Sequence, residues 1–146
     1  MFEPSEEKSR KAHELITQAF GKRIQDTAPY TIAYGYYIKS GFLGIFGQKS
    51  SSYVIGFSEA RKEIIVIPVN SDVDEVGDAI ILKKDDIISV KFGLQGDLKI
   101  KSGKLNEELR LIVPPYTPTT LEDAYILPIN QHEEAEAFKR FVKDTF

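Results

Sequence analysis

Apolar and polar residues alternate along most of the chain, and this alternation predicts a protein built mainly of β-strands. After Pro29 the apolar positions recur with a period of two, which is the spacing of side chains on one face of a strand. Ile80–Leu82 is read as a further short strand or as an extension of the next one. Seven strands separated by turns favour an antiparallel sandwich or barrel. They are predicted near residues 30–39, 52–57, 63–68, 86–92, 97–101, 108–113 and 125–129.

Two segments follow the period of an α-helix instead. Ser5, the acidic residues after it and apolar residues at helical spacing predict a helix over about 5–20, which Gly21 ends. Near the other end of the chain Asn130 is the predicted N-cap of a second helix, with Glu133 three residues later in a variant of the capping box. The apolar stripe of this second helix consists of Ala135, Phe138, Phe141 and Val142.

The order of the predicted elements is four strands, three strands and a closing helix. In this order the chain resembles the bacterial members of the pleckstrin-homology-like (PH-like) superfamily, from about Tyr30 to Phe146. Two local features add to the resemblance: the strand 64–68 with the polar loop that leads to 85–90, and the Phe-rich closing helix. The resemblance implies that the strand near 86–92 belongs to the first sheet. An OB-like or lipocalin-like barrel is the structural alternative.

The resemblance implies a seven-stranded antiparallel PH-like domain over residues 28–146, capped by the C-terminal helix, and an N-terminal helical extension over 1–27. Domains of this superfamily bind lipid head groups, peptides or protein partners, and the fold alone does not fix the function. Membrane-binding relatives carry clustered basic residues in the loop between the first two strands. Here that loop has Lys39 and Lys49 but no Arg, so the resemblance implies a binding or assembly module without a phosphoinositide signature.

The turn after the first long strand is unusually apolar. It contains the glycine-rich segment 41–47, and no Asp or Glu occurs between Asp26 and Glu59, although the chain is acidic overall. Large apolar side chains at a turn either pack into the core or contact a partner. The candidate binding residues are Lys39, Phe42, Leu43, Ile45, Phe46 and Lys49.

Three functions remain open for this chain. The leading hypothesis is protein–protein association, including self-association, through the apolar turn. The second is peripheral binding to an anionic membrane, in which each flanking lysine would contribute roughly 1 kcal/mol. The third is small-molecule binding in a barrel cavity lined by Tyr30, Tyr34 and Tyr36. If the first strand instead continues to Phe46, the apolar side chains of the turn complete the core.

Composition narrows the class of protein. A chain of 146 residues is expected to form a domain with its own core, and a formal net charge of -3 disfavours general nucleic-acid binding. The absence of cysteine excludes disulfides, thiol catalysis and thiolate metal sites. The polar segment Met1–Lys11 lacks the apolar core of a signal peptide. We therefore expect a cytoplasmic protein, with membrane association as the alternative.

Residue patterns for catalysis or for metal binding are not evident. The acidic loop 70–78 lacks the ligands that an EF-hand needs at Val76 and Lys83. His13 and His132 do not have metal-ligand spacing and are expected to be exposed on helices. No glycine-rich phosphate loop occurs. We expect no enzyme activity, no metal and no cofactor.

One hairpin is rich in lysine. Because its lysines alternate with apolar residues, we expect them on the solvent face, where edge strands commonly use lysine to prevent aggregation. A basic ligand site is the alternative. The lysines concerned are Lys91, Lys99, Lys101 and Lys104.

Overall fold

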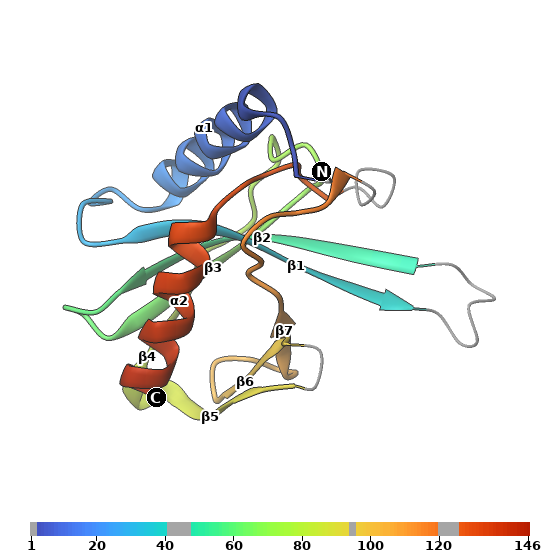
Figure 1. Cartoon of the computed structure of the whole chain (residues 1–146). Helices are drawn as coiled ribbons and strands as arrows, with labels where there is room; N and C mark the ends of the chain where they lie inside the picture. Colours follow the sequence, from blue (N-terminus) through green and yellow to red (C-terminus); the bar gives the residue numbers. More distant parts are fainter. Residues whose placement is uncertain (1–2, 41–47, 94–95, 120–125) are drawn as a thin grey trace.

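The chain folds into two antiparallel sheets and two α-helices (Figure 1). The computed structural model describes residues 3–40, 48–93, 96–119 and 126–146. The first sheet contains, in spatial order, β1 (Thr31–Ser40), β2 (Gln48–Ser58), β3 (Glu63–Val69) and β4 (Ile80–Lys83). The second contains β5 (Ile87–Phe92), β6 (Leu98–Ser102) and β7 (Leu109–Leu111). The helices are α1 (Glu6–Arg23) and α2 (His132–Thr145), and the 3-10 turn η2 (Lys84–Asp86) joins the sheets.

The predicted mainly β chain with a helix near each end is confirmed, but the described strands form two sheets and no closed barrel. The prediction that the strand near 86–92 belongs to the first sheet is wrong. The fourth place in that sheet is taken by β4, in which Leu82 is fully buried opposite Ile64. The turn η2 then redirects the chain, so that β5 pairs with β6 and begins the second sheet.

The predicted strand near 125–129 is also wrong for the residues that are described. Residues 126–129 are irregular, and a single bridge joins Asn130 to Tyr116. A side chain and a short stretch of backbone hold this segment. The Thr117 hydroxyl donates to the carbonyl of Leu127 at 2.7 Å and accepts from the N–H of Ile129 at 2.9 Å. The Thr117 N–H donates to the carbonyl of Ile129 at 2.9 Å, so the segment is bonded without forming a regular strand.

The predicted N-cap is confirmed for α1 and is wrong for α2. Ser5 caps α1 as predicted, since its hydroxyl accepts from the N–H of Lys8 at 3.2 Å. The helix then continues past Gly21 to Arg23, and Ile24 is its C-cap. The predicted N-cap of α2 is wrong, because Gln131 occupies that position and makes no side-chain cap bond. Its side chain is held by strand β1 instead.

Two groups of buried side chains lie on opposite faces of the first sheet. One packs α1 against the sheet, with Ile16 and Phe20 fully buried. Gly56 of β2 allows this approach, because a Cβ there would lie 2.3 Å from the ring of Phe20. The other group joins the two sheets and α2, with Phe57 of β2 against Phe141. Among the described helices, none is both long enough and apolar enough to cross a membrane.

Candidate functional site

The predicted binding residues at the β1–β2 turn lie almost entirely outside the described residues. Segment 41–47, which contains Phe42, Leu43, Ile45 and Phe46, is not described, and only the backbone of Lys39 and Lys49 is. These two lysines are direct partners in the antiparallel ladder. The binding site at the turn therefore remains a prediction, and the structure describes only the two strands that lead into it.

Strands β1 and β2 form a two-stranded ribbon that extends beyond the rest of the first sheet (Figure 1). The ladder between β2 and β3 ends at the pair Ser52–Val69. The ladder between β1 and β2 continues for four more pairs, at positions 37, 38, 39 and 40 of β1. Along this part Ser50 and Ser51 are exposed. Within the residues that the structure describes, no third strand pairs with the ribbon over these four pairs.

The root of the ribbon is fixed to the second half of the molecule. Tyr36 and Ile112 exchange two backbone hydrogen bonds, of 3.0 and 2.7 Å. One residue further along β1, the Tyr37 hydroxyl accepts a hydrogen bond of 3.3 Å from the guanidinium of Arg110, which also bonds Glu108 at 3.1 Å. The bond to Tyr37, followed by that to Glu108, raises the pKa of Arg110. The ribbon therefore leaves the body of the protein from an anchored base.

The three tyrosines that sequence reasoning assigned to a cavity wall have other roles. Tyr34 is fully buried, and its hydroxyl lies 2.7 Å from Ser52 Oγ and accepts from the N–H of Leu127 at 3.2 Å. Tyr36 is only 9% exposed and stacks beside Tyr34. Tyr30 is half-buried, with its ring against Phe20. Tyr34 and Tyr36 therefore belong to the core, and none of the three tyrosines lines the hollow beside α1.

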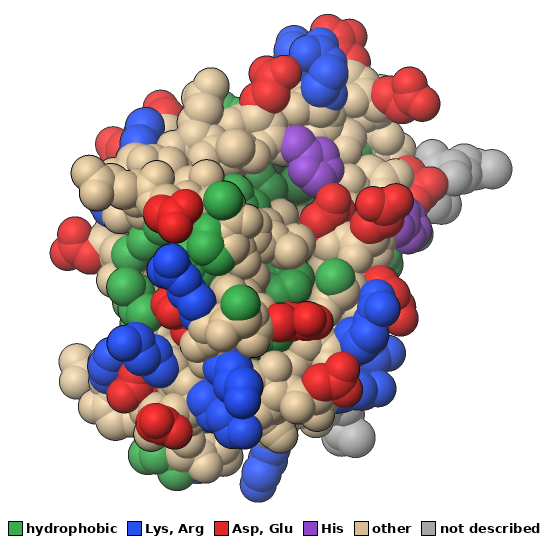
Figure 2. All heavy atoms as spheres, turned by 90° about the vertical axis from the view of Figure 1, so that its left-hand side faces the viewer, with side chains coloured by type: hydrophobic (Ala, Val, Ile, Leu, Met, Phe, Trp, Pro, Cys, Tyr) green, Lys and Arg blue, Asp and Glu red, His purple; other side chains and the backbone are tan. Residues whose placement is uncertain are grey.

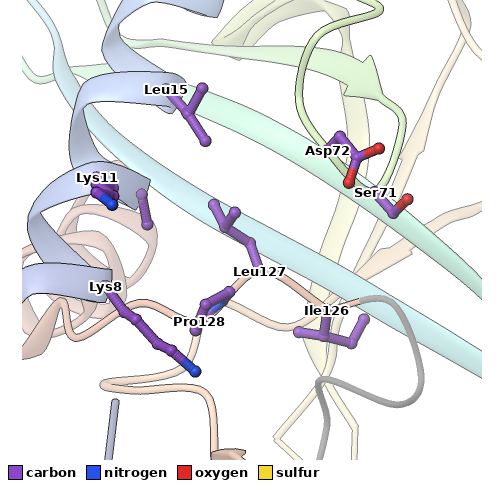
Figure 3. A pocket seen from close by; sticks show the side chains of 9 residues that line it. Lys8, Lys11, Leu15, Ser71, Asp72, Ile126, Leu127 and Pro128 are labelled. Carbon is purple, nitrogen blue, oxygen red and sulfur yellow. The ribbon is translucent and has the colours of Figure 1, made fainter. Parts of the chain in front are cut away.

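A hollow of about 370 Å³ lies instead between α1 and two distant segments (Figure 3). Leu15 of α1 and Leu127 face it, while Asp72 lies across from the helix. Its volume is at the lower end of the range for small-molecule sites, and its lining combines apolar side chains with the charged Lys8, Lys11 and Asp72. Sequence reasoning missed this hollow because residues far apart along the chain form it. They are Lys8, Lys11, Ala12, Leu15, Ser71, Asp72, Ile126, Leu127 and Pro128.

Both histidines make contacts through Nε2 within the chain. Nε2 of His13 lies 2.7 Å from the carbonyl of Asn130, and this histidine is half-buried where exposure was expected. His132 is exposed, with Nε2 2.6 Å from a carboxylate oxygen of Glu3. Within the described ranges, no group of three or more His, Asp or Glu residues could hold a metal ion.

Hydrogen bonds and one buried side chain order the acidic loop 70–78. The Asn70 side chain accepts from the N–H groups of Asp74 and Glu75, both at 3.0 Å. Val73 has a left-handed backbone (φ 58) and is buried in the core beneath α1. Arg23 of α1 donates to two carbonyls of the loop, at 2.7 and 2.9 Å. These contacts hold the loop in one conformation while its carboxylates face solvent.

Three large apolar side chains are exposed among the described residues: Ile81, Ile88 and Phe92, at 37%, 74% and 42%. Ile81 belongs to β4, and the other two belong to β5. Each of these strands lies at an edge of its sheet. These side chains therefore mark the outer strands of the two sheets, away from the β1–β2 ribbon.

Comparison with known proteins gives no relative for this chain. No family model matches it, and neither the curated proteins nor the solved structures include a significant match. The function proposed for the chain therefore depends on the geometry described above.

Proposed function

We propose that this chain is a non-enzymatic assembly module that associates with a protein partner, including a second copy of itself, through the apolar segment at the end of the β1–β2 ribbon. The observation that supports this is the extension of the ribbon by four residue pairs beyond β3. A two-stranded ribbon has little stability of its own in water. A partner that covered it would supply the missing packing surface for Phe42 and Phe46.

We further propose that the chain belongs to the PH-like superfamily. The support is the order of the elements: four strands in one sheet, three strands in the next and a helix after them. In this interpretation α1 is an addition before the domain, and it packs on the first sheet. Scaffolds of this kind bind partners more often than they catalyse reactions, which agrees with the proposed assembly role.

Sedimentation velocity of the full chain up to about 500 µM tests the assembly role. We expect the wild type to form a concentration-dependent oligomer. The double variant Phe42→Asp/Phe46→Asp should remain folded and weaken that association at least about tenfold, because a partner would have to bury unpaired carboxylates. The matched control is Ile88→Asp/Phe92→Asp, which places the same charges on exposed apolar positions of β5 and should associate like the wild type at about 300 mM NaCl, where salt screens charge contacts.

The other interpretations of the turn give different results in the same experiment. A wild type that stays monomeric over the whole concentration range contradicts self-association, and one that then pellets with phosphatidylglycerol vesicles supports membrane binding instead. If Phe42→Asp/Phe46→Asp loses its folded circular dichroism spectrum while the β5 control keeps it, the apolar segment belongs to the core and the proposal is wrong.

A further inference from the structure

Three cationic side chains lie side by side across the second sheet. Lys91 of β5 is the direct partner of Lys99 of β6, and Lys99 is the direct partner of Arg110 of β7. Neighbouring strands are about 4.8 Å apart. Like charges in directly opposite positions destabilise a sheet. The row is therefore expected to cost folding energy.

The same face carries a fourth cation and little compensating charge. Lys101 follows Lys99 by two residues and lies opposite Ser89. Arg110 has an acidic partner, Glu108 at 3.1 Å. In the described parts of the chain, no ion pair joins Lys91, Lys99 or Lys101 to a carboxylate. We call Lys91, Lys99, Lys101 and Arg110 the cationic face.

Protection of a sheet edge does not explain this face. Lysine prevents aggregation when it lies on an edge strand. Two of the four cations, Lys99 and Lys101, are on β6, which is the central strand and is paired on both sides. The expectation of edge protection therefore fits Lys91 alone among the lysines of this face, while Lys104, after β6, pairs with Asp86 at 3.0 Å. An anionic partner is the alternative that accounts for the central pair.

The chain itself carries a segment of complementary charge. The acidic loop 70–78 exposes Asp72, Asp74, Glu75 and Asp78, and its backbone is held by Asn70 and by the buried Val73. A loop that is already ordered loses little conformational entropy when it binds. Its acidic side chains are therefore presented at low entropic cost.

The two charged surfaces lie at opposite ends of one molecule. The loop packs with α1 on one side of the first sheet, whereas the second sheet belongs to the core on the other side. Figure 1 shows this separation, and in the view of Figure 2 most Lys and Arg side chains lie in the lower half of the molecule, interspersed with Asp and Glu. The loop therefore cannot reach the cationic face of its own chain.

We propose that the cationic face binds the acidic loop of a second copy, so that copies associate head to tail. Such a contact is heterologous, and repeated contacts of this kind extend into a chain of molecules or close into a ring. The contact does not use the β1–β2 ribbon. It therefore adds a second, electrostatic mode of self-association to the apolar one proposed above, and the two modes can be tested separately.

Two complementary variants test the contact. Lys91→Glu/Lys101→Glu removes the cationic face and keeps the loop, while Asp72→Lys/Glu75→Lys reverses the loop and keeps the face. In the Phe42→Asp/Phe46→Asp background, which removes the apolar mode, each variant alone should be monomeric in sedimentation velocity at about 20 mM NaCl, because it lacks one half of the contact. An equimolar mixture should associate, because the intact loop of the first variant matches the intact face of the second, and the reversed loop of the second also matches the reversed face of the first. Association of the Phe42→Asp/Phe46→Asp parent should weaken at least about tenfold when NaCl is raised to about 300 mM.

Controls of equal charge separate a specific contact from a change in net charge. Lys22→Glu/Lys139→Glu and Glu59→Lys/Asp144→Lys alter exposed residues elsewhere and should associate like the wild type. The proposal is overturned if the mixture stays monomeric or if the controls lose association equally. Association that is insensitive to salt and is lost only in Phe42→Asp/Phe46→Asp also overturns it, while supporting the ribbon. A monomeric wild type that is retained on heparin through Lys91 and Lys101 assigns the face to a different polyanion and overturns self-docking.

Discussion

The side-chain amide of Gln131 pairs with the backbone of Tyr34 as a neighbouring strand would. Its Nε2 donates to the Tyr34 carbonyl and its Oε1 accepts from the Tyr34 N–H, both at 2.8 Å. The same Nε2 also donates to the carbonyl of Pro114 at 2.9 Å. Two residues further along this edge, Tyr36 pairs with Ile112. One side chain, only 1% exposed, thus replaces a missing strand at the outer edge of β1.

Replacing Gln131 should therefore destabilise the fold strongly. In Gln131→Ala the N–H and carbonyl of Tyr34 lose their partners, and unsatisfied buried polar groups cost about 1–3 kcal/mol each. We expect a loss of about 2–4 kcal/mol in the free energy of unfolding, measured by urea denaturation. Gln18→Ala, on the exposed side of α1, is the matched control and should change stability by less than about 0.5 kcal/mol. Equal losses in the two variants would contradict the strand-like role of Gln131.

Two glycines should respond to alanine in opposite directions. A Cβ on Gly56 would lie 2.3 Å from the Phe20 ring, so Gly56→Ala should push α1 from the sheet and cost about 1–3 kcal/mol. A Cβ on Gly21 would have no neighbour within 4 Å, and the residue is helical, so Gly21→Ala should stabilise by about 0.5–1 kcal/mol. Thermal melting of both variants checks the signs. A gain in Gly56→Ala would show that α1 does not pack as described.

Relief of the like-charge row should stabilise the second sheet. Lys99 lies between Lys91 and Arg110, so Lys99→Gln should raise the free energy of unfolding by about 0.2–1 kcal/mol at low salt. The gain should shrink as salt screens the charges. Lys101→Gln, opposite the neutral Ser89, is the control and should have a smaller effect. A loss of stability in Lys99→Gln at every salt concentration would contradict cross-strand repulsion.

Two buried tyrosines should make the fold sensitive to alkali. Burial raises the pKa of Tyr34 and of Tyr36 above the ordinary value of 10.0. A pKa that is higher in the folded state stabilises the protein fully below the unfolded pKa, and this stability is lost as the pH rises through the folded pKa. The free energy of unfolding should therefore fall above pH 10, by up to about 1.4 kcal/mol per pH unit for each tyrosine.

Tyr36→Phe isolates one of these contributions. Burial is the only cause of the shift in the pKa of Tyr36, so removing its hydroxyl should leave stability near pH 7 little changed and make the decline above pH 10 shallower. Urea unfolding monitored by circular dichroism between about pH 7 and about pH 11 measures both. An unchanged alkaline slope would show that Tyr36 does not contribute to it.

Local patterns predicted the elements well, because each depends on near neighbours in the chain. The alternation after Pro29 and the helical spacing after Ser5 correspond to β1 and α1. Sheet membership could not be predicted in this way. β4 pairs with β3 because Leu82 is buried there, and the strand 86–92 is displaced into the second sheet. Such a choice depends on tertiary contacts that a period of two does not encode.

The candidate binding surfaces were likewise only partly predictable from the sequence. The sequence shows lysines alternating on one hairpin, but only the register of three strands places Lys91, Lys99 and Arg110 side by side. Gln131 looks in the sequence like an ordinary residue at the start of a helix, since nothing nearby marks its bond to Tyr34, 97 positions earlier. The apolar turn was recognisable from composition, and its role stays a prediction because segment 41–47 lies outside the described residues.

The pairing of Tyr34 with Gln131 also sets an order of events during synthesis on the ribosome. All strands of both sheets precede Gln131 in the chain, so they are translated while the outer edge of β1 still lacks this partner. An unpaired strand edge is a template for pairing with other chains. The growing polypeptide thus passes through a period in which β1 is vulnerable to aggregation, and this period ends only when the residues just before α2 have left the exit tunnel.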